Sequence, residues 1–197
     1  MNIMKKLDLS FHNKQKAVKG CVLLSDPFTQ DPYFSRSAIL LCRHNKKETF
    51  GFVLTNYIEI DLHKLDDNLP EIITKISFGG PVEKDNLFYI HTFGKEIEGA
   101  EKIMDTLYFG GDYEMLFELI KADPKRINEV RFFIGYAGWD FEQLNNEMKD
   151  HSWIAVTNIS EKEILSTSSD HFWKDCMTKQ GSKFEMISNF PLNPNEN

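Results

Sequence analysis

Residues 130–145 read Val-Arg-Phe-Phe-Ile-Gly-Tyr-Ala-Gly-Trp-Asp-Phe-Glu-Gln-Leu-Asn, and this stretch indicates the fold most clearly. The apolar run 130–137 predicts a strand, and Gly138-Trp139 predicts a turn after it. Asp140 stands three residues before a glutamine, which is a variant of the capping box, so a helix is expected to follow as far as about Lys149. A strand, a turn and a helix in close succession are typical of α/β domains.

Other short apolar runs predict further strands on both sides of this stretch. They lie at residues 20–25, 37–42, 50–54, 76–78, 87–91 and 153–157. A polar turn joins the second run to the third, which predicts a hairpin. Apolar residues in these two runs are continuous, a pattern typical of strands covered on both faces. We therefore expect an α/β (α+β) fold in which helices flank a mixed β-sheet.

Three more segments show helical patterns. Leucines at helical spacing, followed by a proline, predict a short helix within residues 59–72. Asp112 is expected to cap a helix that ends near Asp123-Pro124. A closing helix is expected at residues 171–180, directly before a glycine.

The length of 197 residues suits one domain with a substantial core, and 16 Phe and 3 Trp predict a core rich in aromatic rings. We expect this domain at residues 18–188, between a flexible basic leader at 1–17 and a flexible tail at 189–197. No run approaches the eighteen or so uncharged apolar residues that a membrane span needs. The N-terminus also lacks the apolar core of a secretory signal, so a cytoplasmic location is expected.

The charge distribution argues against a DNA-binding surface on the domain. The formal net charge is −7, yet residues 1–20 contain five Lys and one Asp, which leaves −11 for the remainder. Nucleic-acid affinity comes largely from basic faces that displace counterions from phosphates. Direct nucleic-acid binding by the acidic body is therefore not expected.

The three cysteines are expected to be reduced thiols. Their number is odd, they lie far apart and they form no Cys-x-x-Cys pair. Cys21 and Cys42 lie inside apolar strand patterns, which predicts buried small hydrophobic residues rather than catalytic groups. Cys176 is the thiol expected to be exposed.

Histidines supply the first set of candidate functional residues. The six histidines lack the short spacing that places two metal ligands on one helix face, and motifs for dinucleotides, phosphate loops, serine hydrolases and metalloproteases are absent. We therefore expect no metal and no cofactor. His44 and His91 each end a predicted strand, so they could converge with Asp31 in one pocket, although a histidine at a strand end is more often a hydrogen-bonded packing residue.

Loops supply the second set. Gly79-Gly80-Pro81 could let a ligand approach the backbone or could form a tight turn, and the turn is favoured. The N–H groups that follow Gly138-Trp139 could bind an anion, but packing of strand against helix is favoured because Asp140 occupies the cap. Asp26 and Asp31 could serve acid-base chemistry, but turn chemistry already explains an aspartate near a proline.

Several of these residues recur in a recognisable order and spacing. They are Gly20 to Leu24, Asp31, Phe34, Ser37, His44, Gly51, Gly79-Gly80-Pro81-Val82, His91, Gly135-Tyr136-Ala137-Gly138-Trp139, Gln143-Leu144 and Glu147. In this pattern the chain resembles the bacterial AlgH/YqgE family over about residues 18–175. The resemblance implies a compact α/β domain on a mixed sheet and a proposed transcriptional-regulator role, with no settled catalytic residues to transfer.

The chain also departs from the family pattern. The family usually has Gly-Ala before the position of Gly51 and an Asn soon after it, whereas this chain has Glu48-Thr49 and Thr55. The resemblance therefore implies no site on that Asn, unless Asn56 substitutes for it.

Three hypotheses about function follow. The favoured one is a non-enzymatic binding or regulatory protein that recognises a protein or a small molecule through the loops of Asp31, Gly79–Pro81 and Gly138-Trp139. The alternative is an enzyme or small-molecule sensor with a pocket of His44, His91 and Asp31. Direct DNA binding through the basic leader ranks last. A monomer or weak homodimer is expected.

Overall fold

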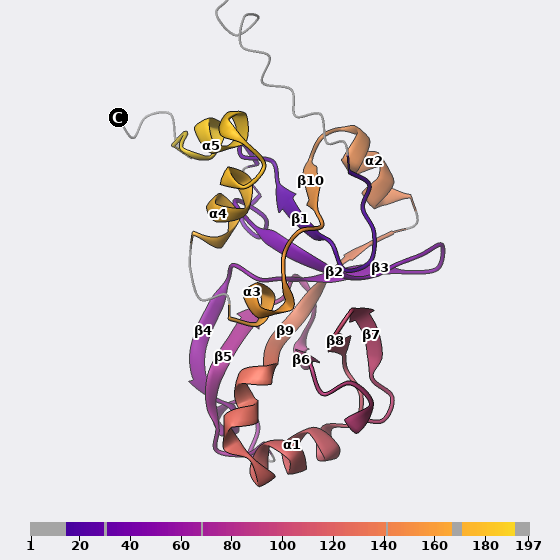
Figure 1. Cartoon of the computed structure of the whole chain (residues 1–197), viewed down its shortest axis with the longest axis vertical. Helices are drawn as coiled ribbons and strands as arrows, with labels where there is room; N and C mark the ends of the chain where they lie inside the picture. Colours follow the sequence, from indigo (N-terminus) through magenta and orange to yellow (C-terminus); the bar gives the residue numbers. More distant parts are fainter. Residues whose placement is uncertain (1–14, 30, 68, 141, 167–170, 192–197) are drawn as a thin grey trace, which may run out of the picture.

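The computed structural model describes residues 15–29, 31–67, 69–140, 142–166 and 171–191 (Figure 1). Strand β9 (Val130–Trp139) is central because it pairs with three other strands. β6 (Val82–His91) runs antiparallel along one edge of β9. The other edge is shared by β3 (Thr49–Val53), which is antiparallel, and β5 (Ile73–Phe78), which is parallel. The expected mixed sheet is confirmed.

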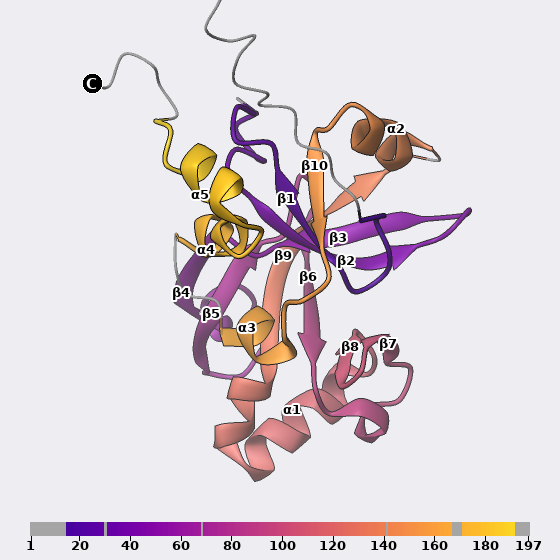
Figure 2. The same ribbon diagram turned by 45° about the horizontal axis from the view of Figure 1, so that its top comes forward.

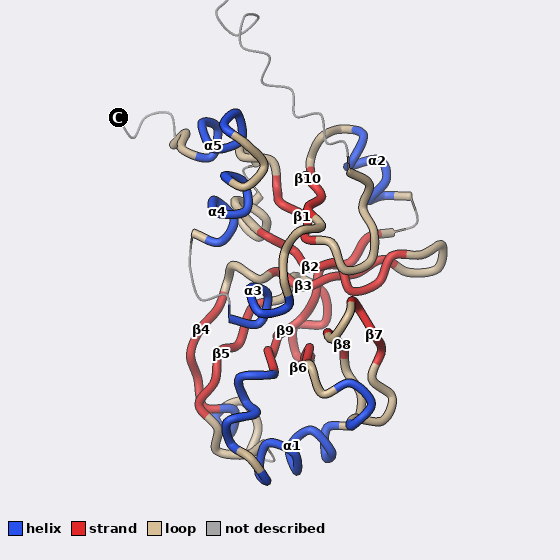
Figure 3. The backbone as a smooth tube through the Cα atoms, viewed as in Figure 1, coloured by secondary structure: helices blue, strands red, loops and turns tan. Residues whose placement is uncertain are grey.

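The sheet extends from these strands in both directions, as the red segments of Figure 3 show. Beyond β3 lie β2 (Ala38–His44), β1 (Val22–Ser25) and β10 (Trp153–Val156); beyond β6 lie β8 (Leu107–Phe109) and β7 (Glu101–Met104); β4 (Tyr57–Asp61) pairs with β5. The expected hairpin of β2 and β3 is confirmed. Figure 2 shows that the sheet curls, with β2 and β3 crossing the direction of β6 at a large angle.

Helices cover the sheet in separate groups. The described helices are α1 (Tyr113–Ala122), α2 (Gln143–Lys149), α3 (Glu161–Ser166), α4 (Phe172–Thr178) and α5 (Ser182–Ser188), with 3-10 turns at Leu62–Lys64, Gly94–Glu96 and Pro124–Glu129. Figure 1 places α1 at the opposite end of the molecule from α5. Each group buries its apolar residues against a different part of the sheet, so the core consists of three apolar clusters within one domain.

The largest cluster is rich in aromatic rings, as the composition predicted. The rings of Phe52 and Phe133 are stacked with centroids 4.3 Å apart, and the rings of Phe50, Phe88 and Phe109 lie around Phe52 with centroids 5.8 to 5.9 Å from its own. Aromatic pairs at these separations stabilise a core by about 1 kcal/mol beyond the burial of their area.

The short link between β5 and β6 has to cross over β9, because these two strands lie on its opposite edges. Residues Gly79 and Gly80 make this crossing in direct contact with the β9 backbone. A Cβ atom at Gly79 would lie 2.3 Å from the carbonyl oxygen of Gly135, and one at Gly80 would lie 2.2 Å from the carbonyl carbon of Tyr136. These glycines are therefore required by the close approach of two backbones.

Gly135 adapts β9 to this crossing. Its φ of +67° is a left-handed conformation that glycine adopts without strain. The register between β6 and β9 also shifts in this region, between Val82 and Leu87. As a result Phe133 and Tyr136, three residues apart, both face the aromatic cluster instead of alternating.

The helix expected within residues 59–72 is wrong. The structure has strand β4 there, followed by a single 3-10 turn at Leu62–Lys64. Leu62 is fully buried, whereas the side chain of Leu65 is 39% exposed. The leucine spacing therefore does not mark one buried helical face.

The turn expected at Gly138-Trp139 is also wrong, because β9 continues through both residues. Gly138 pairs with Phe50 and Trp139 pairs with Thr49 of β3. The helix that follows, α2, is present, but its N-cap is Glu142 with φ +66°. Half of the expected capping box is formed, since the Asp140 backbone N–H donates to the Gln143 side chain at 2.9 Å.

The predicted cap of α1 is confirmed. The Asp112 carboxylate accepts the backbone N–H of Met115 at 2.9 Å, and the helix ends before Asp123. The expected closing helix is present as α4.

The expected leader and tail lie largely outside the described residues. In the described part of the leader, the Gln15 side chain accepts a hydrogen bond from the Thr157 hydroxyl at 3.2 Å, and Ala17 packs on the α2 side of the sheet. At the other end, Arg36 donates to the carbonyl oxygen of Phe190. Contacts with the domain thus reach beyond the expected limits of 18 and 188. In the described part of the chain, no helix is long and apolar enough to cross a membrane.

Candidate functional site

Two loops singled out by the sequence meet at one apolar hollow of about 410 Å³. Its lining residues are Tyr33, Val53, Asn56, Phe78, Gly80, Lys84 and Ile134, and we call it the Gly80 hollow. Tyr33 belongs to the loop of Asp31, and Gly80 belongs to the crossing link. The Gly80 hollow therefore lies where the end of β5 and the link after it meet the loop before β2.

The carboxylate of Asp31 shapes this loop and is not directed to chemistry. It accepts the backbone N–H groups of Tyr33 at 2.8 Å and Phe34 at 3.1 Å, an arrangement typical of an aspartate turn. Phe34 then packs edge-on against Trp153 with centroids 5.7 Å apart. Asp26 forms a similar bond to Phe28 at 2.7 Å, and burial raises its pKa. Turn chemistry therefore accounts for both aspartates.

The margin of the Gly80 hollow combines exposed aromatic rings with one cation. Tyr33 and Phe78 are each 46% exposed, so both rings can be contacted from solvent. The ammonium group of Lys84 lies 4.8 Å from the centre of the Tyr33 ring and donates to its hydroxyl at 2.8 Å. Such a surface suits an apolar group that has a carboxylate beside it. The sequence did not predict Tyr33, Phe78 and Lys84 as site residues. Nothing in the local sequence separates an exposed ring from a buried one, or shows that a lysine lies beside such a ring.

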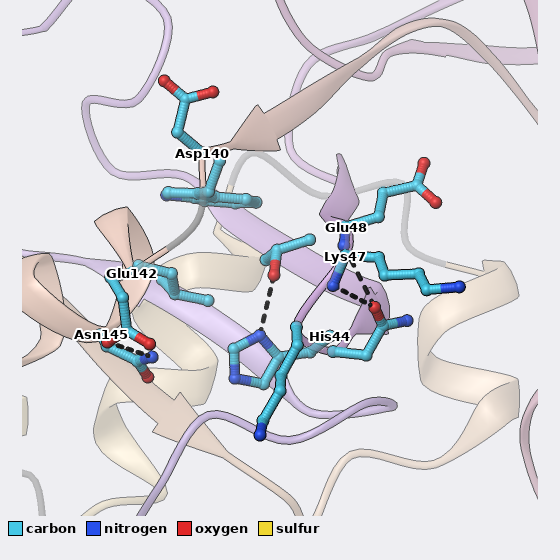
Figure 4. Close-up of a pocket in the computed structure, with 11 residues that line it drawn as sticks. His44, Lys47, Glu48, Asp140, Glu142 and Asn145 are labelled. Carbon is cyan, nitrogen blue, oxygen red and sulfur yellow. Dashed lines mark hydrogen bonds between the residues drawn. The ribbon is translucent and has the colours of Figure 1, made fainter.

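His44 lies in a different and more polar hollow of about 280 Å³ (Figure 4). This His44 hollow lies between the β2–β3 loop and the start of α2, with Trp139, Thr49 and Leu144 among its lining residues. The Nδ1 atom of His44 is 3.0 Å from the Thr49 hydroxyl oxygen. No partner for its Nε2 atom is found among the described residues, so that nitrogen can meet a ligand.

The loop that borders the His44 hollow is held by Asn45. Its side-chain oxygen accepts the backbone N–H groups of Lys47 at 2.8 Å and Glu48 at 3.1 Å. On the other side, the side chain of Asn145 donates to Glu142 at 3.3 Å. The hollow is thus bordered by carboxylates and ammonium groups together, which suits a small polar ligand.

His91 does not reach either hollow. It is fully buried, its Nε2 is 3.0 Å from the Gly110 carbonyl oxygen and its Nδ1 accepts the Phe93 N–H at 3.2 Å. Burial lowers the pKa of His91, so the neutral ring that these bonds require is favoured. His91 is a packing residue, the interpretation that the sequence favoured.

The pocket of His44, His91 and Asp31 is therefore not formed. His91 pairs with Val130 at the start of β9, whereas Thr49, the partner of His44, pairs with Trp139 at its end. Nine residues of strand correspond to about 30 Å. The two histidines belong to the same sheet, but they lie near opposite ends of its central strand, β9.

Trp139 is held by a carboxylate shared with a second tryptophan. Glu147 of α2 accepts the indole N–H groups of Trp139 at 2.8 Å and Trp153 at 2.7 Å, and its other oxygen accepts Gln143 at 2.7 Å. The Trp139 and Trp153 rings contact edge-on with centroids 5.9 Å apart. The bonds from Trp139 of β9 and Trp153 of β10 to Glu147 thus fasten α2 to the sheet. Gly138, one residue earlier, is exposed on the opposite face.

Of the loop residues singled out by the sequence, two groups remain near hollows. Gly80 lines the Gly80 hollow, with Gly79 and Pro81 beside it in the chain, while Trp139 lines the His44 hollow. Among the described residues, no three His, Cys, Asp or Glu side chains gather in a way that could hold a metal ion.

All three cysteines are buried, so the expected exposure of Cys176 is wrong: it is 1% exposed because it faces the core from α4. Burial raises the pKa of Cys21 to about 11 and that of Cys176 to about 12, and raises that of Cys42 strongly. At pH 8 the reactive thiolate is therefore scarce in the native state.

We expect the native thiols to react with Ellman's reagent at pH 8 on the order of a hundredfold more slowly than the same thiols in urea, because burial restricts both ionisation and access. The absorbance time course measures this. A single cysteine that reacts rapidly in the native protein would contradict the burial of that residue.

Comparisons with known proteins agree on one family. A family model described as AlgH-like matches residues 22–185. Relatives called UPF0301 protein include one from Parabacteroides distasonis, 39% identical over 93% of each chain, and one from Cytophaga hutchinsonii, 33% identical over 91% of this chain and 98% of the other. The chain is also similar in fold to two solved structures. They are the AlgH protein from Pseudomonas aeruginosa (22% identity, TM-score 0.68, 90% of this chain and 98% of the other) and a protein from Corynebacterium diphtheriae (21%, 0.72, 89% and 94%).

Proposed function

Since this chain belongs to the AlgH-like family, and two of its sequence-predicted loops border one apolar hollow, we propose that it is a non-enzymatic binding protein with a regulatory role. Its binding site is the Gly80 hollow, and its partner is a segment of another protein. The observation that carries the proposal is that Tyr33, from the loop before β2, converges with Phe78 and Gly80, from the end of β5 and the link after it, around an apolar hollow with exposed rings.

The residues that line the Gly80 hollow indicate which side chains the partner's segment carries. An apolar side chain of the partner fills the space between Phe78 and Val53, and a neighbouring carboxylate meets the Lys84 ammonium group. Lys84 and Ile134 also line a second hollow of about 530 Å³ that continues toward Leu87 and Tyr113. The two hollows share residues, so they can accommodate an extended segment rather than a single side chain.

A regulatory role of this kind works through protein contacts. The body of the chain carries a net charge of −11 once the basic residues 1–20 are set aside, and an acidic surface repels phosphate. We therefore propose that direct DNA binding is not its mode of action.

A matched pair of variants on β5 tests the site. Peptides selected from a displayed random library on the immobilised full-length protein are labelled, and their affinities are measured by fluorescence polarisation. We expect Phe78→Ser to weaken binding by about tenfold or more, since a ring at the centre of a contact contributes over 1 kcal/mol. Ile73→Ser, on the same strand and 70% exposed but outside the hollow, is the control and is expected to leave the affinity unchanged.

A second variant examines the charge. Lys84→Gln is expected to weaken the binding of peptides that carry a carboxylate and to spare neutral ones. Selected peptides that are basic, or that bind Phe78→Ser as tightly as the unaltered protein, would show that the Gly80 hollow is not the site.

A small polar ligand in the His44 hollow is the second candidate. The observation that favours it is the Nε2 atom of His44, whose ring is oriented by Thr49 and which has no partner among the described residues. Ligand binding that is lost in His44→Ala but retained in Phe78→Ser would select this candidate over the first.

A further inference from the structure

Two cations lie side by side on the face of the sheet opposite the Gly80 hollow. Ile76 of β5 pairs with Phe132 of β9, so the register, continued by one residue, places Lys75 beside Arg131. Lys75 and Ser77 are two residues apart on one strand and share a face, and the Ser77 hydroxyl accepts from Arg131 at 2.8 Å. Like charges on adjacent strands destabilise a sheet unless something lies between them.

Arg131 is buried without a carboxylate partner among the described residues. It is 3% exposed, and its guanidinium donates to the carbonyl oxygens of Ile164 at 2.6 Å and Leu54 at 2.5 Å, as well as to Ser77. All three acceptors are neutral. Burial lowers the pKa of Arg131 to about 10, so the group still carries its charge at neutral pH. A buried charge without a counter-charge is costly.

Two other arginines have the carboxylate partners that Arg131 lacks among the described residues. Arg43 contacts Glu48 and Glu101, and Arg126 contacts Glu96 and Glu129, although both arginine side chains are more exposed than Arg131. The most buried of these guanidinium groups is therefore the one without a carboxylate in the described part of the chain.

Arg131 and Lys75 line one hollow of about 390 Å³, in which an anion can lie. The polar residues Thr74, Asn128 and Ser166 line the same hollow, and Glu59, which pairs with Lys75 across β4 and β5, is the one acidic residue in this lining. Two cations and one anion leave a net positive charge inside a chain whose body is acidic.

We propose that this hollow binds a small oxyanion, a phosphate or carboxylate group, between Lys75 and Arg131. The anion supplies the counter-charge that Arg131 lacks among the described residues, and it accepts charge-assisted hydrogen bonds from both cations. Thr74 and Asn128 border the same space. This site is independent of the proposed partner-binding site, because it shares no lining residue with the Gly80 hollow.

Isothermal titration of the full-length protein with inorganic phosphate, at constant ionic strength in a chloride buffer, tests the proposal. Saturable binding of one phosphate is expected, with an affinity at least about tenfold lower in Lys75→Gln. Lys121→Gln is the matched control, since Lys121 is an exposed lysine on α1 that pairs with Glu118. The control is expected to bind like the unaltered protein. Titration with acetate tells a carboxylate ligand from a phosphate group.

Two results would overturn the proposal. One is no saturable binding of either anion, or equal binding by Lys75→Gln. The other concerns Asp170, an acid that follows α3 in the sequence and lies outside the described residues. If Asp170→Asn binds phosphate and the unaltered protein does not, the counter-charge comes from the chain itself. Arg131→Lys serves as a second variant, because it keeps the charge and changes the geometry.

Discussion

Gly80→Ala is expected to destabilise the protein by about 3 kcal/mol or more, because overpacking of a core position alone costs about 1–3 kcal/mol and a backbone cannot yield as a side chain does. The added Cβ would lie 2.2 Å from the carbonyl carbon of Tyr136 and 2.3 Å from the backbone nitrogen of Ala137. Urea unfolding followed by tryptophan fluorescence measures the change. Since a domain of this size has about 5–15 kcal/mol of stability, a low yield of folded protein is also consistent with the expectation.

Two further glycine variants separate the causes. Gly79→Ala adds a comparable clash, at 2.3 Å from the Gly135 carbonyl oxygen. Gly110→Ala has a positive φ of +62° but no heavy atom within 4 Å, so it reports the conformational cost alone, about 1 kcal/mol. If Gly80→Ala costs no more than Gly110→Ala, the two backbones do not cross in contact.

Glu147→Ala is expected to reduce the free energy of unfolding by about 2–4 kcal/mol. The substitution leaves the indole N–H groups of Trp139 and Trp153 without their shared acceptor, and each unsatisfied buried donor costs about 1–3 kcal/mol. Near-ultraviolet circular dichroism reports the loss of the fixed tryptophan environment, and urea unfolding gives the energy.

Conservative changes around Glu147 provide the controls. Glu147→Gln keeps an oxygen acceptor and is expected to lose about half as much, since hydrogen bonds to a charged group are the stronger ones. Gln143→Ala removes one exposed partner of the same carboxylate and is expected to cost less than about 1 kcal/mol. A loss for Glu147→Ala no larger than that for Gln143→Ala would mean that the carboxylate does not fasten α2 to the sheet.

Several strands could be predicted from the sequence because their apolar runs are largely buried. β2, β3 and β9 are of this kind. The mixed character of the sheet comes from the parallel pairing of β5 with β9. β7 and β8 were not predicted, because β7 begins with the charged pair Glu101-Lys102 and β8 has three residues, so neither contains an apolar run of strand length and both owe their conformation to pairing with a neighbour. Leu62, Leu65 and Leu69 led to a wrong prediction because their spacing does fit a local pattern, that of a helix, but tertiary contacts override this local preference.

The candidate site was predictable in part. The glycines at 79 and 80 attracted attention by residue type alone, and the crossing of β9 explains them. Convergence of His44 with His91 could not be judged, because two strand ends meet or separate according to the order of strands in the sheet. Tyr33 and Phe78 could not be found, because exposure depends on what covers a ring and not on the ring itself.

The link over β9 has a consequence for the way the polypeptide acquires its structure. β5 and β6 are neighbours in the chain, yet neither can complete its ladder until residues 130–139 have arrived between them. The closure of these ladders depends on contacts distant in sequence, which is typical of slow folding. During synthesis, the edges of segment 73–91 that face β9 therefore stay unpaired until residues 130–139 have been made, and unpaired strand edges of this kind are prone to aggregation.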